Sequence, residues 1–120
     1  MSLLGARVLV VEDEAIVCMM IEDFLSDMGC KVAATASSLD EALTKSRTIE
    51  IDTAILDINL AGKLSYPVAS VLLKRQVPFL FATGYGVAGV PSELQGVPVL
   101  AKPFSIGQLE VMLLRALAAK

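Results

Sequence analysis

The sequence predicts a doubly wound α/β domain, in which helices cover both faces of a five-stranded parallel sheet. Two observations carry this prediction: five short apolar runs without charged residues, and stretches with helical patterning between them. Strands of a parallel sheet are buried on both faces, so they read as continuous apolar runs. Right-handed crossovers then place helices on both sides of the sheet. The expected strands are Val8–Val11, Val32–Ala36, Thr53–Leu56, Val77–Ala82 and Val97–Ala101.

Two helices are predicted from their internal pattern. Glu14–Met28 carries one apolar face and one acidic face, and Gly29 follows as a C-terminal stop. Pro67 suits the first turn of a further helix that runs to Lys74 or Arg75, because proline lacks the N–H that would be unpaired there.

Two other helices are predicted from capping signals at their N-termini. Ser38 with Glu41, and Ser105 with Gln108, have the spacing of a capping box. The stretch after the fourth expected strand differs, because its glycines and Pro91 oppose helix formation. We expect a fourth helix there that is short or mobile, with at most a turn at Pro91–Gln95.

Length and composition favour one soluble domain over residues 1–120, since a chain of 120 residues forms a single core. The longest apolar run, Ala15–Ile21, is far shorter than the roughly 20 residues of a membrane-spanning helix. The N-terminus lacks the pattern of a secretory signal, so a cytoplasmic protein without a membrane partner is expected. Cys18 and Cys30 have no CxxC spacing and are expected to be reduced packing residues.

Charge and composition exclude several functions. A net charge of −3 and a pI near 4.8 argue against direct binding of nucleic acid, which needs clustered Lys and Arg. The chain has no histidine, which excludes Ser-His and Cys-His catalysis and the commonest zinc ligands. Its chemistry must therefore use carboxylates, hydroxyls and amines.

Polar residues follow or end four of the expected strands: Glu12 with Asp13, Asp57, Thr83 and Lys102. Ligands of doubly wound sheets bind at the carboxyl ends of the strands, so these side chains should converge. Clustered carboxylates repel one another unless a cation neutralises them, and Mg²⁺ prefers such oxygen ligands. The hydroxyl and the ammonium group suit the oxygens of a phosphoryl group.

The same residues lie in four motifs: Val10–Glu14 (VVEDE), Ile55–Leu60 (ILDINL), Phe81–Thr83 (FAT) and Lys102–Phe104 (KPF). In this order and spacing they resemble the receiver domain of response regulators along the whole chain. The resemblance implies a flavodoxin-like (βα)5 fold with strand order 2-1-3-4-5. It further implies a phosphorelay protein that is not an enzyme, and that catalyses only its own phosphorylation and dephosphorylation.

The resemblance also assigns roles to site residues. It implies that Asp57 is the phosphoacceptor, and that Mg²⁺ is held by Glu12, Asp13, Asp57 and the backbone carbonyl of Asn59. It implies that the phosphoryl group is bound by Thr83 and Lys102, and that the peptide bond before Pro103 is cis.

A narrower resemblance concerns the switch. Phe81–Gly86 (FATGYG) is similar to the signature of the FAT GUY subgroup, with Gly86 where that signature has an aromatic residue. Val99 stands where most receivers carry a switch Tyr or Phe. We therefore expect Gly84, Tyr85 and Gly86 to begin a different switch, in which phosphorylation orders the segment from Gly84 to Gly96. For the Tyr85 ring, packing on this segment and a role beside the phosphoryl group are equally open.

The last helix carries a second apolar stripe, Val111, Leu114 and Ala118, beside its inward face. This stripe is either a partner face or, for Leu114, packing against the fourth-helix region. The expected phosphoryl donor is a sensor histidine kinase or a histidine phosphotransfer protein, the downstream protein partner is unknown, and the chain is expected to be a monomer or weak dimer. Two alternatives stay open: a small Mg²⁺-dependent phosphatase with an aspartyl nucleophile, and a pseudo-receiver that only binds partners.

Overall fold

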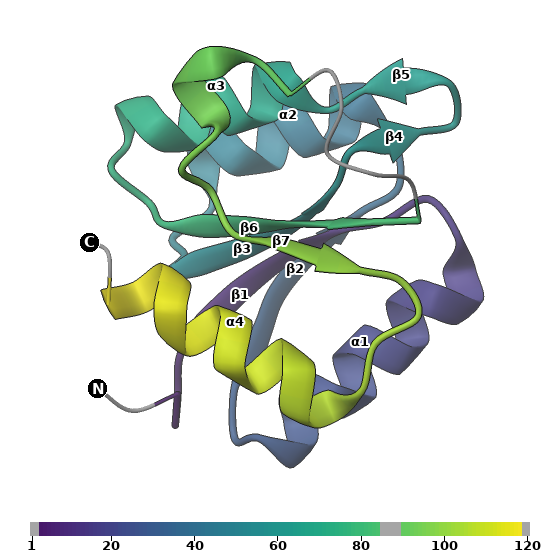
Figure 1. Cartoon of the computed structure of the whole chain (residues 1–120), viewed down its shortest axis with the longest axis vertical. Coiled ribbons are helices and arrows are strands. Elements are labelled where there is room, and N and C mark those ends of the chain that lie inside the picture. The colour runs from purple at the N-terminus through teal and green to yellow at the C-terminus, as the bar shows by residue number, and fades with distance from the viewer. Residues whose placement is uncertain (1–2, 85–89, 119–120) are drawn as a thin grey trace.

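The computed structural model describes residues 3–84 and 90–118. Its main sheet has five parallel strands in the order β2-β1-β3-β6-β7 (Figure 1). Counted without two short strands of a separate hairpin, this is the expected order 2-1-3-4-5, so the predicted fold class is confirmed. The strands of the main sheet are β1 (Arg7–Val11), β2 (Lys31–Ala36), β3 (Thr53–Asp57), β6 (Phe79–Thr83) and β7 (Val99–Ala101).

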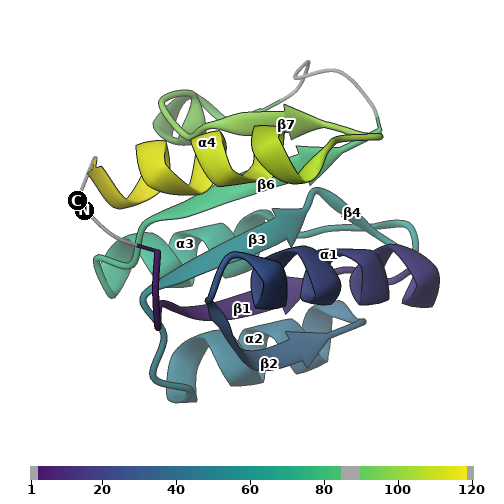
Figure 2. The ribbon, with the colours of Figure 1, turned by 90° about the horizontal axis from the view of Figure 1, so that it is seen from below.

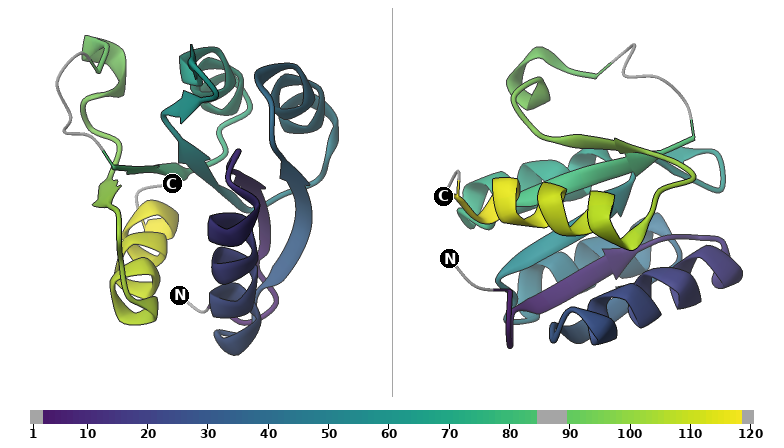
Figure 3. Two further views of the ribbon diagram at one scale, coloured as in Figure 1. Left: turned by 90° about the vertical axis from the view of Figure 1, so that its right-hand side faces the viewer. Right: turned by 60° about the horizontal axis from the view of Figure 1, so that its bottom comes forward.

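Two helices cover each face of the sheet. Helices α1 (Ala15–Asp27) and α4 (Ile106–Ala118) lie on one face, and α2 (Leu39–Thr48) and α3 (Tyr66–Lys74) lie on the other (Figure 2). Figure 3 shows the two helical layers on either side of the strands. None of the described helices is long and apolar enough to cross a membrane.

The alternation of side chains along β1 divides the core into two clusters. Val8 and Val10 pack with α1 and α4, whereas Leu9 and Val11 pack with α2 and α3. All four side chains are at most 1% exposed, as expected for a strand buried on both faces. The continuous apolar run was therefore a correct signal for an inner strand.

Both predicted N-caps form, but only the capping box of α4 is complete, because at α2 Glu41 Oε1 accepts the N–H of Ser37 at 2.7 Å and not that of Ser38. Ser38 Oγ accepts the N–H of Glu41 at 3.2 Å at the start of α2. At the start of α4, Ser105 Oγ accepts the N–H of Gln108 at 3.2 Å, and Gln108 Oε1 accepts the N–H of Ser105 at 2.8 Å. These bonds satisfy backbone donors that have no partner inside a helix.

The fourth-helix region holds only a 3₁₀ turn, η1 (Ser92–Leu94), anchored by Leu94, which is 1% exposed. The predicted short turn at Pro91–Gln95 is thus confirmed. The expected starts of the fourth and fifth strands at Val77 and Val97 are wrong by two residues, since β6 and β7 begin at Phe79 and Val99. A proline follows each of the two valines, and it has no N–H for the ladder.

A hairpin between β3 and α3 was not predicted. It consists of β4 (Asn59–Leu60) and β5 (Lys63–Leu64), which pair antiparallel. Its two turn residues, Ala61 and Gly62, have φ angles of 50° and 90°. Strands of two residues are too short to show a periodic pattern, and alanine is not a usual residue for positive φ.

Candidate functional site

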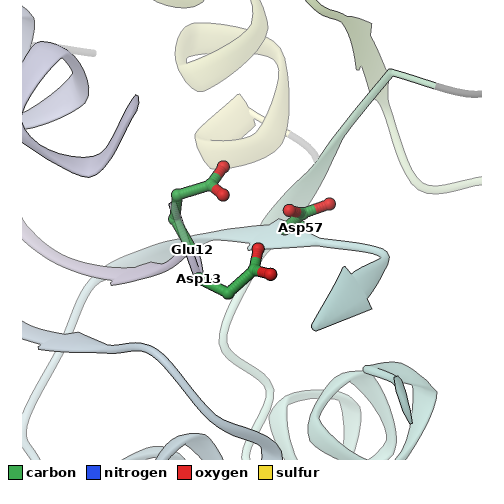
Figure 4. Close-up of side chains that lie close together, drawn as sticks. All are labelled: Glu12, Asp13 and Asp57. Atoms are coloured by element: carbon green, nitrogen blue, oxygen red, sulfur yellow. The ribbon is translucent and has the colours of Figure 1, made fainter. Parts of the chain in front are cut away.

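Three carboxylates meet at the carboxyl end of two neighbouring strands. Glu12 and Asp13 follow β1, and Asp57 is the last residue of β3. Val11 pairs with Leu56 in the parallel register, which places the residues after them side by side. One carboxylate oxygen of each acid lies within 4.8 Å of the others, and Figure 4 shows the three groups turned toward a common space.

Lys102, which follows β7, reaches across to two of these carboxylates. Its Nζ lies 2.5 Å from Glu12 Oε1 and 3.1 Å from Asp57 Oδ2. Its backbone N–H donates to the carbonyl of Thr83 at 2.9 Å, which ties the residue to the end of β6. The lysine thus links the ends of β1, β3 and β7 through one charged group.

Each carboxylate also accepts one backbone N–H. Glu12 Oε2 accepts the N–H of Glu14 at 3.1 Å, and Asp57 Oδ1 accepts the N–H of Asn59 at 3.3 Å. Asp13 Oδ2 accepts the N–H of Ala61 at 3.0 Å, across the gap between β1 and the hairpin. The roles of Glu14 and Ala61 are backbone roles, so residue types in the sequence give no signal for them.

The surroundings shift the pKa values of Asp57 and Lys102, whose side chains form an ion pair. Burial raises the pKa of Asp57 to about 6; the charge of Glu12 adds to this, and Lys102 opposes it. For Lys102, burial acts to lower the pKa, but the hydrogen bond to Glu12 and the charge of Asp57 outweigh it and raise the pKa. The lysine is therefore charged, whereas Asp57 changes protonation state in the mildly acidic range.

A cavity of about 360 Å³ lies over these groups. It is lined by Asp13, Glu14, Asp57, Asn59, Ala61, Gly84 and Lys102. Hard oxygen donors with one ammonium group beside them fit a small divalent cation such as Mg²⁺, which takes one or two carboxylates and keeps several waters. The remaining space above Asp57 and Lys102 is suited to an anionic group.

The other predicted site residues lie as follows. Thr83 ends β6 with 2% exposure, and the peptide bond between Lys102 and Pro103 is cis, as expected. Tyr85 and Gly86 lie outside the described residues. Val99 pairs with Phe81 in the sheet and does not line the cavity.

The second stripe of the last helix is open to solvent. Val111 is 51% exposed, Leu114 is 36% exposed, and Ala118 is also exposed. The fourth-helix region therefore does not cover the whole Leu114 side chain. The stripe lies on the side of α4 that faces away from the sheet core.

A family model settles what kind of domain this is: residues 8–114 match the response regulator receiver domain. The chain belongs to this family. The match spans every strand of the sheet except the first residue of β1, and it includes all of the acids of the cleft and Lys102.

Solved structures agree with this assignment. SdrG from Sphingomonas melonis Fr1 is 42% identical and matches with a TM-score of 0.79, covering 99% of this receiver and 98% of that chain. A BeF3-activated conformation of SdrG, from Pseudomonas melonis Fr1, is 39% identical with a TM-score of 0.78 and covers 92% and 95%. The receiver domain of PhyR from Erythrobacter litoralis is 25% identical with a TM-score of 0.82, covering 96% and 92%.

The first curated relatives are longer than this receiver. The protein-glutamate methylesterase/protein-glutamine glutaminase of Archaeoglobus fulgidus is 29% identical over 99 residues, which are 82% of this chain and 28% of that protein. Matches to these longer relatives span between 28% and 52% of their lengths. What they share with this chain is the receiver domain.

Proposed function

We propose that this receiver takes a phosphoryl group onto Asp57 from a phosphohistidine of a sensor kinase or a histidine phosphotransfer protein. The observation that carries the proposal is the cleft itself: three carboxylates within 4.8 Å, and Lys102 in contact with two of them, in a receiver fold. Such donors would act in the cytoplasm, which is the compartment we infer for the chain.

Asp57 is the group with the chemistry of an acceptor. A carboxylate oxygen of Asp57 would attack phosphorus, the bond from phosphorus to the donor nitrogen would break, and the electron pair would stay on the imidazole. The pKa of about 6 leaves most Asp57 side chains ionised at neutral pH and thus able to attack. The acceptor is consumed once per transfer, so the chain is not an enzyme that acts on a separate substrate.

Glu12, Asp13, Asp57 and the carbonyl of Asn59 would hold Mg²⁺, which would neutralise charge on the phosphoryl oxygens. Lys102 would exchange its contact with Asp57 for a phosphoryl oxygen, because the ammonium already lies 3.1 Å from the acceptor. Thr83, at the end of the adjacent strand, would donate its hydroxyl to another oxygen.

Output through a protein contact is part of the proposal. The stripe of Val111, Leu114 and Ala118 supports it, because apolar side chains on a helix are exposed there. The narrower FAT GUY resemblance and the switch at Gly84, Tyr85 and Gly86 stay predictions, since two of these residues lie outside the described part of the chain.

The experiment is incubation with acetyl phosphate, with and without Mg²⁺, followed by intact mass and by assay of released phosphate. We expect the mass of one phosphoryl group per chain, dependent on Mg²⁺, and slow release. Continuous release of phosphate with no labelled protein would instead support a phosphatase, and neither label nor release would support a pseudo-receiver.

A further inference from the structure

The tip of the β4–β5 hairpin forms one wall of the acceptor cleft. Ala61 lines the cavity, and its N–H donates to Asp13 Oδ2 at 3.0 Å. Its φ of 50° lies in the left-handed region, which disfavours any residue with a Cβ atom. A non-glycine residue held in this conformation beside a reactive site suggests that the conformation has a local role.

The rest of the hairpin keeps Ala61 in this conformation. Gly62 donates its N–H to Asn59 Oδ1 at 2.8 Å, which closes the turn. Leu60 is 2% exposed and anchors one strand in the core, and the N–H of Ser65 donates to the carbonyl of Ile58 at 2.8 Å at the hairpin base. The turn is thus fixed from both sides, so the direction of the Ala61 N–H is fixed as well.

Asp13 depends on this N–H more than the other two acids depend on theirs. Lys102 contacts Glu12 and Asp57, whereas no cationic side chain among the described residues contacts Asp13. Asp13 is also the more exposed member of the acidic pair, since Glu12 is buried. Repulsion from the neighbouring carboxylates would turn Asp13 toward solvent without a hydrogen bond to hold it.

We propose that the Ala61 N–H is a positioning group, which holds the Asp13 carboxylate in the orientation that binds the cation. The proposal rests on the proposed function of the cleft. It assigns the role to the backbone of Ala61 at positive φ, and none to its methyl group. Groups that orient a metal ligand typically change metal affinity about 10- to 100-fold when they are lost, so an effect of at least about tenfold is expected.

The test uses two substitutions of the same residue and one matched control. Ala61→Val opposes positive φ, because a β-branched residue is rarely found there, whereas Ala61→Gly tolerates it and keeps the N–H. Gln76→Val is the control: Gln76 also has a positive φ, of 60°, but lies in the turn before β6, at the end of that strand remote from the cleft. Gln76→Val therefore shows how a β-branched residue at positive φ affects Mg²⁺ binding when that residue does not contact Asp13.

Mg²⁺ affinity is measured by calorimetric titration of each folded protein with MgCl₂ alone. We expect Ala61→Val to bind Mg²⁺ at least about tenfold more weakly, with Ala61→Gly and Gln76→Val close to the unsubstituted protein. Labelling of Ala61→Val by acetyl phosphate should be slow at low Mg²⁺ and should recover at saturating Mg²⁺. Equal Mg²⁺ affinities of Ala61→Val and Gln76→Val would overturn the proposal.

A second measurement covers the case in which Ala61→Val does not fold. Hydrogen exchange of the Ala61 amide is compared between the unsubstituted protein and Asp13→Ala, and protection should be lost in the variant. Equally fast exchange of the Ala61 amide in the two proteins, with normal labelling of Asp57 in the unsubstituted protein, would overturn the positioning role alone. Absence of labelling in the unsubstituted protein would instead overturn the proposed function.

Discussion

At the scale of single residues, the cleft holds more negative charge than its own lysine neutralises. Three acids share the space, and one ammonium contacts two of them. The pKa of Asp57 is raised to about 6 by burial and by Glu12, against the effect of Lys102. Without a bound cation, ionised Asp57 therefore destabilises the folded state, and a proton relieves this.

This imbalance predicts the effect of removing the Asp57 charge. In the folded protein the pKa of Asp57 lies above its ordinary value of 3.8, so protonation of Asp57 favours the folded state. This contribution to the free energy of unfolding is fully present below about pH 4 and is lost as the pH rises through 6. Asp57→Asn should therefore be more stable than the unsubstituted protein by about 1–2 kcal/mol at pH 7 without Mg²⁺, and no more stable at pH 4. Urea unfolding across this pH range measures the difference, and a constant difference would contradict the assigned pKa.

Lys102 is predicted to act on the phosphoryl group more than on the cation. Lys102→Ala removes a positive charge from the cleft, so Mg²⁺ binding should be kept or strengthened while labelling of Asp57 slows by at least about tenfold. Lys63→Ala is the matched control, because it removes the same charge from an exposed residue of the hairpin. Normal labelling of Lys102→Ala would refute the role, as would a loss of labelling equal to that of Lys63→Ala.

At the scale of elements, what could be predicted depended on how local the signal was. The N-cap bonds of Ser38 and Ser105 each join residues three apart in sequence, so the local sequence indicates directly where these helices begin. The hairpin gave no such signal, because alanine is not a usual residue at positive φ and its N–H meets an Asp13 that is 48 residues away in sequence. Strands β6 and β7 begin two residues later than the apolar runs predict, because a proline precedes each of them.

The N-cap of α4 is predicted to contribute measurably to the free energy of unfolding. Ser105→Ala removes the acceptor for the Gln108 N–H, so the free energy of unfolding should fall by about 1 kcal/mol. Ser70→Ala, an exposed position inside α3, is the control and should leave stability unchanged or slightly higher. Chemical denaturation of both variants decides the matter, and equal effects would mean that the cap contributes nothing.

At the scale of the whole molecule, the topology brings distant segments to one cleft. Lys102 contacts acids that lie 90 and 45 residues away in sequence. The sequence predicted this meeting because parallel strands present their carboxyl ends at one edge of a sheet. It could not predict which carboxylates Lys102 contacts, since that depends on the packing of three strands, nor the backbone donors Glu14 and Ala61.

The same topology predicts that cation binding stabilises the entire fold. Mg²⁺ binds the assembled cleft and not the separated acids of the unfolded chain, so Mg²⁺ at about 100 times its Kd should add about 2.7 kcal/mol to the free energy of unfolding. Thermal unfolding should therefore shift upward with Mg²⁺, and Asp13→Ala should reduce the shift. An identical shift in Asp13→Ala would show that the cation binds elsewhere.

The central claim is that Asp57 accepts the phosphoryl group in a cation-dependent reaction, and peptide mapping of the labelled protein tests it most directly. After incubation with acetyl phosphate and Mg²⁺, borohydride reduction converts an aspartyl phosphate to homoserine and marks its position. We predict homoserine at position 57 in the unsubstituted protein only when Mg²⁺ is present, and no label in Asp57→Asn. A label at another residue, or a label at position 57 that needs no divalent cation, would contradict the account.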